Sequence, residues 1–541
     1  MPGVPIQIDR KTVARANAGD LAVLAVSRGR ARLETVLGAA KDIDAVLEGL
    51  LVERGLRRPH PHVSARPASD PWPRHDLTGL LAFTIDPETA KDFDDAISVR
   101  REDDGLRAWV HIADVSHFVG AGSPLDLAAA DRAFSYYVPG RVAPMLPHEL
   151  ADDLCSLRPH VDRHCVTVEI PFDGSLTPGA PRFYRSLIRS DARLTYGQVE
   201  RILQGRERAE PALAEALRHC DRLTAELRRR RFARGALQVS SPEVTFALDG
   251  NGGISDAWRE SEPHAHALVE ELMILANECV AQLLTRKRRE ALYRVHERPD
   301  PQAIELLLAR LDDLDVPTPP APDPERMGPS EAAAVAAATA ERVASYVGRA
   351  KRGKEAFPSL VLRALKRARY DPANLGHSGL ASPAYCHFTS PIRRYPDLVV
   401  HRALLRELGA GDDALPDDLP GLAGHCSVRE REASDVEYAA DALCLAWLLE
   451  DRLFELGWEA TFPGEIIGLI ESGLFVRFGE VFEGYVPARR LEGDFFEWNP
   501  LATALRGRRS GRVYRLGDPL EVRVVEIRRN EGKVELAPAA A

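Results

Sequence analysis

The sequence predicts an α+β protein built from several domains. Its 541 residues exceed the size of one ordinary domain, and length alone favours about three to four. Hydrophobic residues make up 45% of the chain and charged residues 28%, which is the composition of a globular protein. Helical spacing of apolar residues and strand-like alternation occupy different stretches, which indicates that both kinds of element are present.

The first 70 residues are expected to form a small module. Residues 19–27 and 30–37 have the patterns of strands, and 41–56 carries apolar residues at helical spacing. The stretch 57–76 is rich in proline and histidine, and we predict that it is a linker.

The centre of the chain begins with strands and continues with helices. Residues 79–119 contain strands separated by the turn EDDG. Helices are predicted near 210–232 and 264–286, and further helical tracts at 331–350 and 359–370. On the second helix, Glu270 and Asn277 are two turns apart and are expected on one face, opposite the apolar stripe.

The C-terminal part changes to short alternating strands. Five strands are expected in about 80 residues, within the segments EIIGLI, GLFVRF, EGYVPA, PLEVRVVEIRR and KVELA. This number and size are typical of a small OB-type barrel.

Composition also limits where the protein acts. No run approaches the roughly 18 apolar residues of a membrane-spanning helix, and residues 1–11 lack the pattern of a secretion signal. The seven cysteines are scattered without a C-x-x-C pair, which argues against disulfides and zinc. We therefore expect a cytoplasmic protein, without a membrane partner and monomeric.

The net charge of the chain argues against nucleic-acid binding, whereas local basic clusters favour it. The net charge is −10, whereas a basic footprint is the usual mark of a nucleic-acid binder. Arginine and lysine nevertheless cluster at 228–234, 351–354, 363–369 and 506–515. Each cluster alone is more often a solvated face, and together they make a nucleic-acid channel plausible.

The stretch TIDPETAKDFDDAIS (84–98) carries four aspartates within ten residues, Asp86, Asp92, Asp94 and Asp95. Like charges this close raise one another's pKa unless a cation neutralises them. Carboxylates without histidine or cysteine suit Mg²⁺ or Mn²⁺, and two such ions can assist phosphodiester hydrolysis. The alternative is an acidic, turn-rich loop that faces solvent. An EF-hand is excluded because its glycine and final glutamate are missing.

This aspartate stretch resembles the signature of the ribonuclease II / ribonuclease R (RNB) family, and further blocks follow in the family's order. The blocks are VHIADVSHFV (110–119), RAFSYYVPGRVAPMLPHELADDLCSLRP (132–159), RGAL (234–237), LVEELMILAN (268–277), YRVHE (293–297) and HFTSPIRRYPDLVVHR (387–402). The resemblance implies an RNB catalytic domain over about 75–460, with mixed sheets and helices around a deep channel. Residues 461–541 are similar to an S1-type RNA-binding barrel.

The resemblance implies an activity, a substrate and a cofactor. Family members are processive 3′→5′ exoribonucleases that thread single-stranded RNA with a free 3′ end into the channel. They release nucleoside 5′-monophosphates with the help of Mg²⁺. Carried over to this chain, Asp86, Asp92, Asp94 and Asp95 are metal ligands, and Asp94 is expected to matter most for the rate.

Further site residues follow from the same resemblance. Arg393 and Arg394 would place positive charge at the scissile phosphate, with Arg393 favoured as catalytic. The expected RNA-binding residues are Tyr137, which stacks on a base, Tyr196, where the RNA path ends, Glu270, which holds the terminal ribose, and Glu437, near the channel floor.

Two features depart from the family pattern. A phenylalanine that sandwiches the last base commonly follows RGAL, but Val239 stands near that position here. Family members also often begin with two cold-shock-type barrels, for which residues 1–70 are too few. We expect a nucleic-acid-binding module there, either winged-helix-like or one trimmed OB barrel, and its strand-plus-helix pattern favours the former.

Two other functions compete with the nuclease. The chain could be an RNA-binding protein that keeps the fold but has lost catalysis, and such a protein should lack one of the four aspartates. Alternatively, the S1-type barrel could be the working part, as in a ribosome-associated factor, although this leaves the catalytic blocks unexplained.

Overall fold

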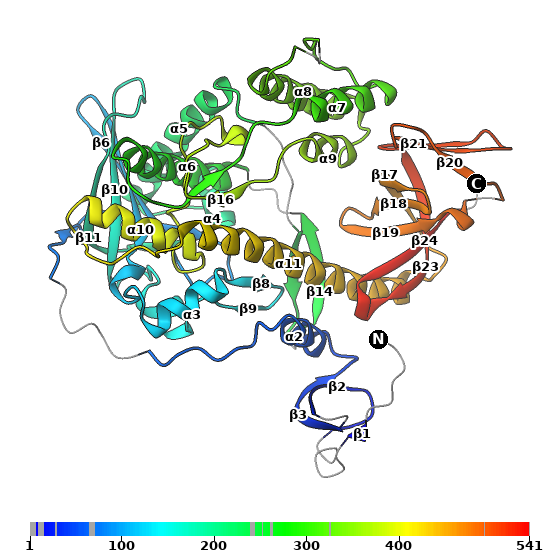
Figure 1. Ribbon diagram of the computed structural model, residues 1–541, viewed down its shortest axis with the longest axis horizontal. Helices are drawn as coiled ribbons and strands as arrows, with labels where there is room; N and C mark the ends of the chain where they lie inside the picture. Colours follow the sequence, from blue (N-terminus) through cyan, green and yellow to red (C-terminus); the bar gives the residue numbers. More distant parts are fainter. Residues whose placement is uncertain are drawn as a thin grey trace.

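The computed structural model describes residues 7–8, 16–27, 30–63, 71–237, 244–250, 253–259, 263–323, 326–491 and 493–539. Figure 1 shows a small N-terminal module at the bottom, a large body of sheet and helices at the left, and a barrel at the right. Helix α11 (Leu419–Leu456) runs across the molecule from the body to the barrel. This architecture confirms the expected α+β, multidomain class.

A three-stranded sheet and one helix form the N-terminal module. The strands β1 (Gln7–Ile8), β2 (Asp20–Ser27) and β3 (Arg30–Ala39) lie in the order β1-β3-β2. Helix α2 (Ile43–Glu53) begins where the Asp42 carboxylate accepts a hydrogen bond from the Asp44 backbone N–H. The buried residues of α2 pack against α11, so α2 attaches the module to the body. The small α/β module is confirmed, and its winged-helix-like character stays a prediction.

The body is organised around a seven-stranded mixed sheet. In spatial order its strands are β12 (Ala192–Thr195), β5 (Phe83–Asp86), β6 (Asp95–Glu102), β7 (Gly105–Ala113), β10 (Asp162–Phe172), β11 (Arg182–Arg189) and β4 (His75–Asp76). The outer pairs β12–β5 and β11–β4 are parallel, and the inner neighbours are antiparallel.

Both faces of this sheet are covered. Helices α5 (Pro211–Ala233) and α6 (Pro263–Arg286) lie on one face, and α3 (Pro124–Arg132) with the first turns of α11 lies on the other. Strand side chains alternate between faces, so Ile97 joins the first core and its neighbour Ala96 the second. A sheet buried on both faces gives a rigid base for the loop between β5 and β6.

Several elements surround this base. They are α4 (Tyr196–Leu203), α7 (Pro301–Asp313), α8 (Pro329–Ala350), α9 (Ala356–Arg363), α10 (Tyr395–Glu407), β8 (Tyr136–Val138), β9 (Arg141–Ala143), β13 (Val244–Leu248), β14 (Ile254–Arg259), β15 (Tyr293–Val295) and β16 (Arg369–Asp371). Helices α5, α6 and α8 lie where the sequence predicts helices.

The prediction of a helix at 359–370 is wrong for the second half of that range. Helix α9 ends at Arg363, and residues 369–371 form β16, which pairs with β15. The backbone N–H of Tyr370 also donates to the Ser427 hydroxyl on α11 at 2.9 Å. Strand pairing and this contact satisfy the backbone, and they override the local helical pattern.

The C-terminal part forms the expected barrel. Strands β17 (Thr461–Ile470), β18 (Gly473–Phe478), β19 (Phe482–Pro487), β23 (Pro519–Arg528) and β24 (Lys533–Pro538) close into a five-stranded barrel. A separate sheet made of β20 (Phe496–Trp498), β21 (Ala504–Gly507) and β22 (Val513–Arg515) was not anticipated.

None of the helices in the described ranges is both long and apolar enough to cross a membrane. All seven cysteines are free thiols, and six of them are buried.

A buried charge pair joins α3 to α10. Nη2 of Arg402 on α10 donates to Oδ1 of Asp126 on α3 at 2.8 Å, and the Arg402 side chain is fully buried. The Tyr395 hydroxyl donates to the same oxygen at 2.9 Å. This pair and the Tyr395 hydroxyl hold the start of α10, whose first residue, Tyr395, is the last residue of the SPIRRY segment (residues 390–395).

We predict that Asp126→Ala lowers the free energy of unfolding by about 3–5 kcal/mol, because it removes the hydrogen-bonded partner of the buried Arg402 charge and leaves only the Asp413 carboxylate, 3.8 Å away. Urea unfolding followed by tryptophan fluorescence measures this loss. Asp131→Ala is the control, since Asp131 is half-exposed and pairs with Arg58 on the surface. That variant should lose no more than about 1 kcal/mol. Equal losses in the two variants would contradict the prediction.

Candidate active site

The four aspartates lie at and between the ends of two adjacent strands. Asp86 ends β5, Asp95 begins β6, and the connecting loop carries Asp92 and Asp94. Phe93 of this loop is buried, and its backbone N–H donates to the Ser156 hydroxyl at 3.1 Å. The loop is therefore anchored to the core, which argues against the alternative of a solvated acidic turn.

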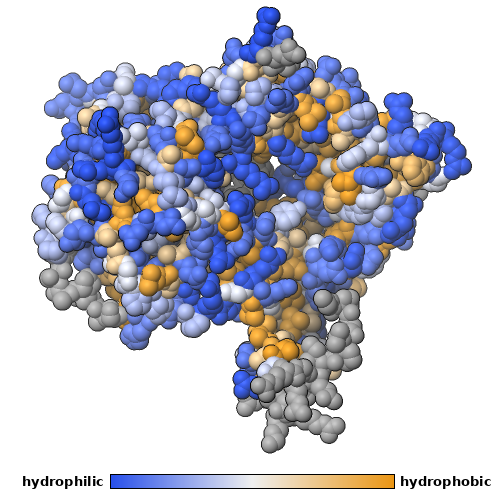
Figure 2. Space-filling view, viewed as in Figure 1, coloured by the Kyte–Doolittle hydropathy of each residue, from blue (hydrophilic) through white to orange (hydrophobic). Residues whose placement is uncertain are grey.

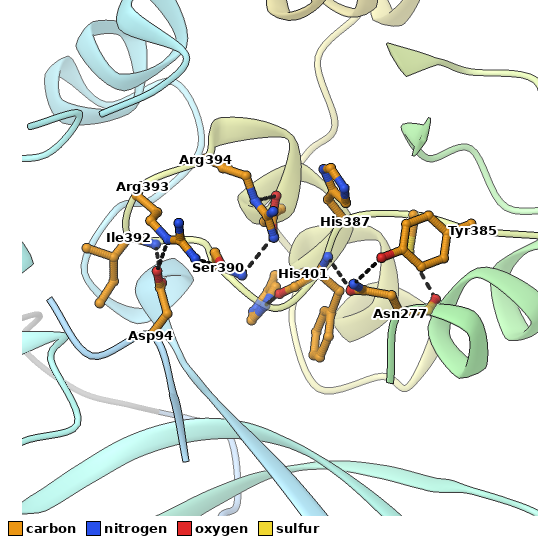
Figure 3. Close-up of polar contacts among 12 residues, drawn as sticks. Asp94, Asn277, Tyr385, His387, Ser390, Ile392, Arg393, Arg394 and His401 are labelled. Atoms are coloured by element: carbon orange, nitrogen blue, oxygen red, sulfur yellow. Dashed lines mark hydrogen bonds and ion pairs between the residues drawn. The ribbon is translucent and has the colours of Figure 1, made fainter. Parts of the chain in front are cut away.

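Asp94 is held against the SPIRRY segment, far away in the sequence. Its Oδ1 accepts a hydrogen bond from the Ile392 backbone N–H at 2.8 Å, and its Oδ2 accepts one from Nε of Arg393 at 3.2 Å (Figure 3). Burial raises the pKa of Asp94 well above its usual range, while the nearby Arg393 charge opposes this shift. The contact joins an almost completely buried carboxylate to a guanidinium whose side chain is 46% exposed.

Asp92 contacts a second predicted residue. The Tyr137 hydroxyl, from β8, donates to Oδ2 of Asp92 at 2.5 Å. The backbone N–H of Tyr137 donates to Oε1 of Glu437, on α11, at 3.3 Å. Burial first, and then the Asp92 charge, raise the pKa of the Tyr137 phenol. The structure thus brings Asp92, Tyr137 and Glu437 together from three separate elements.

Asp86 and Asp95 form the remaining part of the cluster. Burial raises the pKa of both carboxyls, and the Asp95 charge raises that of Asp86 further. Oδ2 of Asp86 is buried and has no hydrogen-bond partner within the described residues. A buried oxygen without a donor beside a second carboxylate fits a cation.

The cluster is not a complete metal cage. Across the described residues, no group of three or more histidine, cysteine, aspartate or glutamate side chains is arranged to hold a metal ion. Asp92 and Asp94 are engaged by Tyr137 and Arg393 instead. Mg²⁺ commonly uses one or two protein carboxylates together with water and substrate phosphate, and the pair Asp86 and Asp95 fits that preference.

Arg394 lies differently from its neighbour. Its Nη2 and Nε donate to the Asp397 carboxylate at 2.7 and 3.0 Å, across the start of α10. Figure 3 shows Arg393 directed toward Asp94, and Arg394 on the other side of the segment. The charge of Arg394, after that of Arg393, still opposes the rise in the pKa of Asp95 that burial causes. The sequence alone did not separate these two orientations.

Two buried residues that the sequence analysis did not assign to the site hold the SPIRRY segment and the residues just before it. Asn277 on α6 accepts from the Phe388 backbone N–H at 2.8 Å and donates to the Tyr385 hydroxyl at 3.1 Å. Asp397 accepts from the Ser390 backbone N–H at 2.8 Å. Asn277 was expected on the face opposite the apolar stripe, but it is only 2% exposed, because the packed segment covers it.

Tyr196, at the start of α4, lies against α6, which carries Glu270. The Tyr196 ring stacks on His266, with ring centroids 4.0 Å apart and planes at 12°. It directly follows Thr195, which pairs with Asp86 between β12 and β5. Glu270, one turn beyond His266, is half-exposed and accepts from Nη2 of Arg231 at 3.3 Å. Val239, near the position of the expected phenylalanine, lies outside the described residues.

A hollow separates the body from the barrel (Figure 2). Next to it, a cavity of about 790 Å³ lies between α11 and the barrel strands, and Tyr438, Phe475 and Tyr485 are among its lining residues. Aromatic rings beside such a space suit the faces of unpaired bases.

Comparison with known proteins gives the family. An RNB domain model matches residues 74–409, and an S1 RNA binding domain model matches 457–537. A Ribonuclease R of Aquifex aeolicus is 35% identical over 554 residues, which cover 98% of this chain and 76% of that protein. The Ribonuclease R of Escherichia coli (strain K12) is 36% identical over 482 residues, or 86% of this chain, so the chain spans 57% of that relative's length.

The fold agrees with a solved relative. The structure of Mycoplasma genitalium RNase R in complex with ribose methylated single-stranded RNA superposes with a TM-score of 0.84 at 27% identity, over 98% of this chain and 84% of that one. The matched regions contain all four aspartates and the SPIRRY segment. The chain belongs to the RNB family of exoribonucleases and carries an S1 domain.

Proposed function

We propose that this protein is a processive 3′→5′ exoribonuclease that hydrolyses single-stranded RNA to nucleoside 5′-monophosphates in RNA decay and processing, with Mg²⁺ or Mn²⁺ as cofactor. The contact between Asp94 and Arg393 carries this proposal. It places an exposed guanidinium beside four carboxylates on a buried scaffold, which is the charge arrangement that phosphodiester hydrolysis requires.

Arg393 acts on the scissile phosphate in this mechanism. Its Nε donates to Asp94 and its Nη2 to the Ser390 hydroxyl at 3.2 Å, so the guanidinium is oriented before substrate arrives. Its half-exposed edge donates to the phosphate oxygens as negative charge builds up on them. Arg394 contributes its positive charge through space, because its Nε and Nη2 donate to Asp397.

Asp86 and Asp95 would hold the cation, and Asp92 and Asp94 would complete its negative surroundings. A bound divalent ion lowers the pKa of water and stabilises the leaving oxygen. Asp94 also keeps the Ile392 backbone in place, and Tyr137 keeps Asp92 in one orientation. The protein residues thus set positions and charge before the reaction.

Four further residues would bind the RNA. The Tyr137 ring provides a platform for a base, and Glu437 holds the backbone of that tyrosine. Glu270 accepts a hydrogen bond from a ribose 2′-hydroxyl, which distinguishes RNA from DNA. Tyr196, fixed by His266, closes the end of the path.

We also propose the division of labour among the domains. Residues 75–460 carry the catalytic channel, residues 461–541 guide RNA toward it, and residues 1–70 are a nucleic-acid-binding module. The protein would act as a cytoplasmic monomer. A catalytically silent RNA-binding protein is the alternative, and the presence of all four aspartates on an anchored loop favours the enzyme.

We predict that Asp94→Asn lowers kcat by at least about 100-fold, the size of effect expected when a charge-orienting group is lost from the site. The asparagine can still accept from Ile392, so the fold and RNA binding should stay close to wild type. Release of nucleoside monophosphates from a 3′-labelled RNA measures the rate. Asp435→Asn, at an exposed position on α11, is the matched control and should keep full activity. Unchanged release by Asp94→Asn would reject the proposed mechanism.

We further predict that EDTA abolishes monophosphate release and that added Mg²⁺ restores it. Because Mg²⁺ relieves the repulsion between Asp86 and Asp95, it should also raise the melting temperature, by an amount equivalent to about 2.7 kcal/mol at 100 times its Kd. Differential scanning calorimetry measures this shift. Asp86→Asn should melt higher than wild type without metal and should respond less to Mg²⁺. A metal response that survives this substitution unchanged would place the cation elsewhere.

A further inference from the structure

A group of charged side chains joins the N-terminal module to the β8–β9 hairpin, which carries Tyr137. The module contributes Asp44 and Glu48 of α2 and, shortly after this helix, Arg57, while the hairpin contributes Arg141 of β9. We name these four charged residues the hairpin clamp. Asp44 and Glu48 are about one helical turn apart, so they lie on the same side of α2. Figure 1 shows α2 beneath the hairpin and α11.

The contacts within the hairpin clamp form one network. Nη1 of Arg141 donates to Oε2 of Glu48 at 2.8 Å, and its Nη2 donates to Oδ1 of Asp44 at 2.6 Å. Nε and Nη2 of Arg57 donate to the two Glu48 oxygens at 2.7 Å, and its Nη1 donates to the Val142 carbonyl at 3.4 Å. A single exposed ion pair contributes little, but a bidentate pair within a network of charges holds a defined geometry.

Apolar contacts support the hairpin clamp. Tyr136 and Val138 of β8 and Ala143 of β9 are buried in a core that they share with α2 and α11. The α2 residues of this core are Ile43, Val46, Leu47 and Leu51. The N-terminal module is therefore part of the surface on which the hairpin packs.

Tyr137 lies on the opposite face of the hairpin. It pairs with Val142, and because side chains alternate along a strand, both point away from the face that carries Arg141. On its own face, the Tyr137 hydroxyl donates to Asp92. The hairpin thus lies between the N-terminal module on one side and the aspartate cluster on the other.

The hairpin depends on its neighbours for a fixed position. Each of its strands has only three residues, and a two-stranded hairpin is marginally stable by itself. The hairpin clamp holds β9 at Arg141 and at the Val142 carbonyl, and Val142 is the cross-strand partner of Tyr137. A movement of β9 would therefore carry the Tyr137 ring away from Asp92.

We propose that the N-terminal module is a positioning element of the catalytic site, and that Asp44, Glu48 and Arg141 are positioning residues for the Tyr137 ring. This inference rests on the proposed function, in which that ring stacks on a base. The role does not require the module itself to touch RNA. Release of the hairpin clamp lets the ring turn away from the base, so that RNA binds more weakly.

The test breaks the hairpin clamp and leaves the apolar contacts of α2 in place. Glu48→Ala removes the carboxylate that Arg57 and Arg141 share, and Arg141→Ala breaks the same network from the hairpin side. Asp131→Ala is the matched control, because it breaks the pair between Arg58 and α3, away from the hairpin. Urea unfolding followed by circular dichroism establishes that each variant is folded.

RNA binding is measured in EDTA, so that hydrolysis does not interfere. The probes are single-stranded RNAs that carry 2-aminopurine at successive positions near the 3′ end. Stacking on an aromatic ring quenches the fluorescence of this base. The position at which fluorescence rises in Tyr137→Ala therefore marks the base that stacks on Tyr137.

Glu48→Ala and Arg141→Ala should each raise the Kd for RNA by about threefold or more, a size typical of the loss of a coupled contact. Both should also raise the fluorescence at the position that Tyr137→Ala identifies. In a Tyr137→Ala background, Glu48→Ala should cause no further change in Kd, because the ring that it positions is gone. Asp131→Ala should match wild type throughout.

Three results would overturn the inference. They are a wild-type Kd in Glu48→Ala, an equal loss of affinity in Asp131→Ala, and a loss in Glu48→Ala that persists undiminished in the Tyr137→Ala background. The last result would mean that the module contributes to RNA binding independently of Tyr137. If Tyr137→Ala itself bound RNA with wild-type Kd and fluorescence, the proposed base platform would fail instead, so the two failures are distinguishable.

Discussion

The hydrogen bonds that Asp94 accepts from Ile392 and Arg393 connect two segments about 300 positions apart in the chain. One is the loop at the edge of the central sheet, and the other is the SPIRRY segment before α10. Neither segment alone brings a carboxylate and a guanidinium together. Because Asp94 is almost fully buried, its charge depends on these donors, and the positions of the other site residues depend on this junction.

Charge is distributed unevenly among the four aspartates. Asp92 and Asp94 have protein partners, whereas Asp86 and Asp95 repel each other, and burial raises the pKa of both. A site with all four carboxylates fully paired would have little need of a cation. The repulsion between Asp86 and Asp95 is unfavourable, and a divalent ion bound between them would relieve it. A divalent ion beside Asp86 and Asp95 and the Arg393 guanidinium beside Asp94 would thus together neutralise the negative charge of the cluster.

Helix α11 and a few side-chain contacts fix the body, the N-terminal module and the barrel relative to one another. Helix α11 supplies Glu437 behind Tyr137, supports the N-terminal module through α2, and reaches the barrel. The barrel is also held from another side. Glu465 of β17 accepts hydrogen bonds from the start of α9, and Arg515 of β22 donates to the end of α7. Hydrogen bonds from several elements leave the barrel little freedom to swing. The contacts between the barrel and the body therefore fix the size and shape of the space between them.

The sequence by itself named the residues expected at the site and most of the elements that carry them. The aspartate stretch is recognisable from its own spacing, Tyr137 and Arg393 were named through the family resemblance, and the five barrel strands follow from alternation in a short segment. These features are local, because residue type and period are set within about ten positions. Local pattern failed at 369–371, where pairing with a distant strand replaced the expected helix.

Only the tertiary structure decided which partner each of the named residues contacts and how deeply it is buried. Arg393 and Arg394 are adjacent and chemically identical, yet one faces Asp94 and the other Asp397. Asn277 and Glu270 lie on the same helix, yet one is buried against residues 385–388, just before the SPIRRY segment, and the other is half-exposed. Such differences arise from packing between elements far apart in the chain, and no local spacing encodes which partner a long side chain meets.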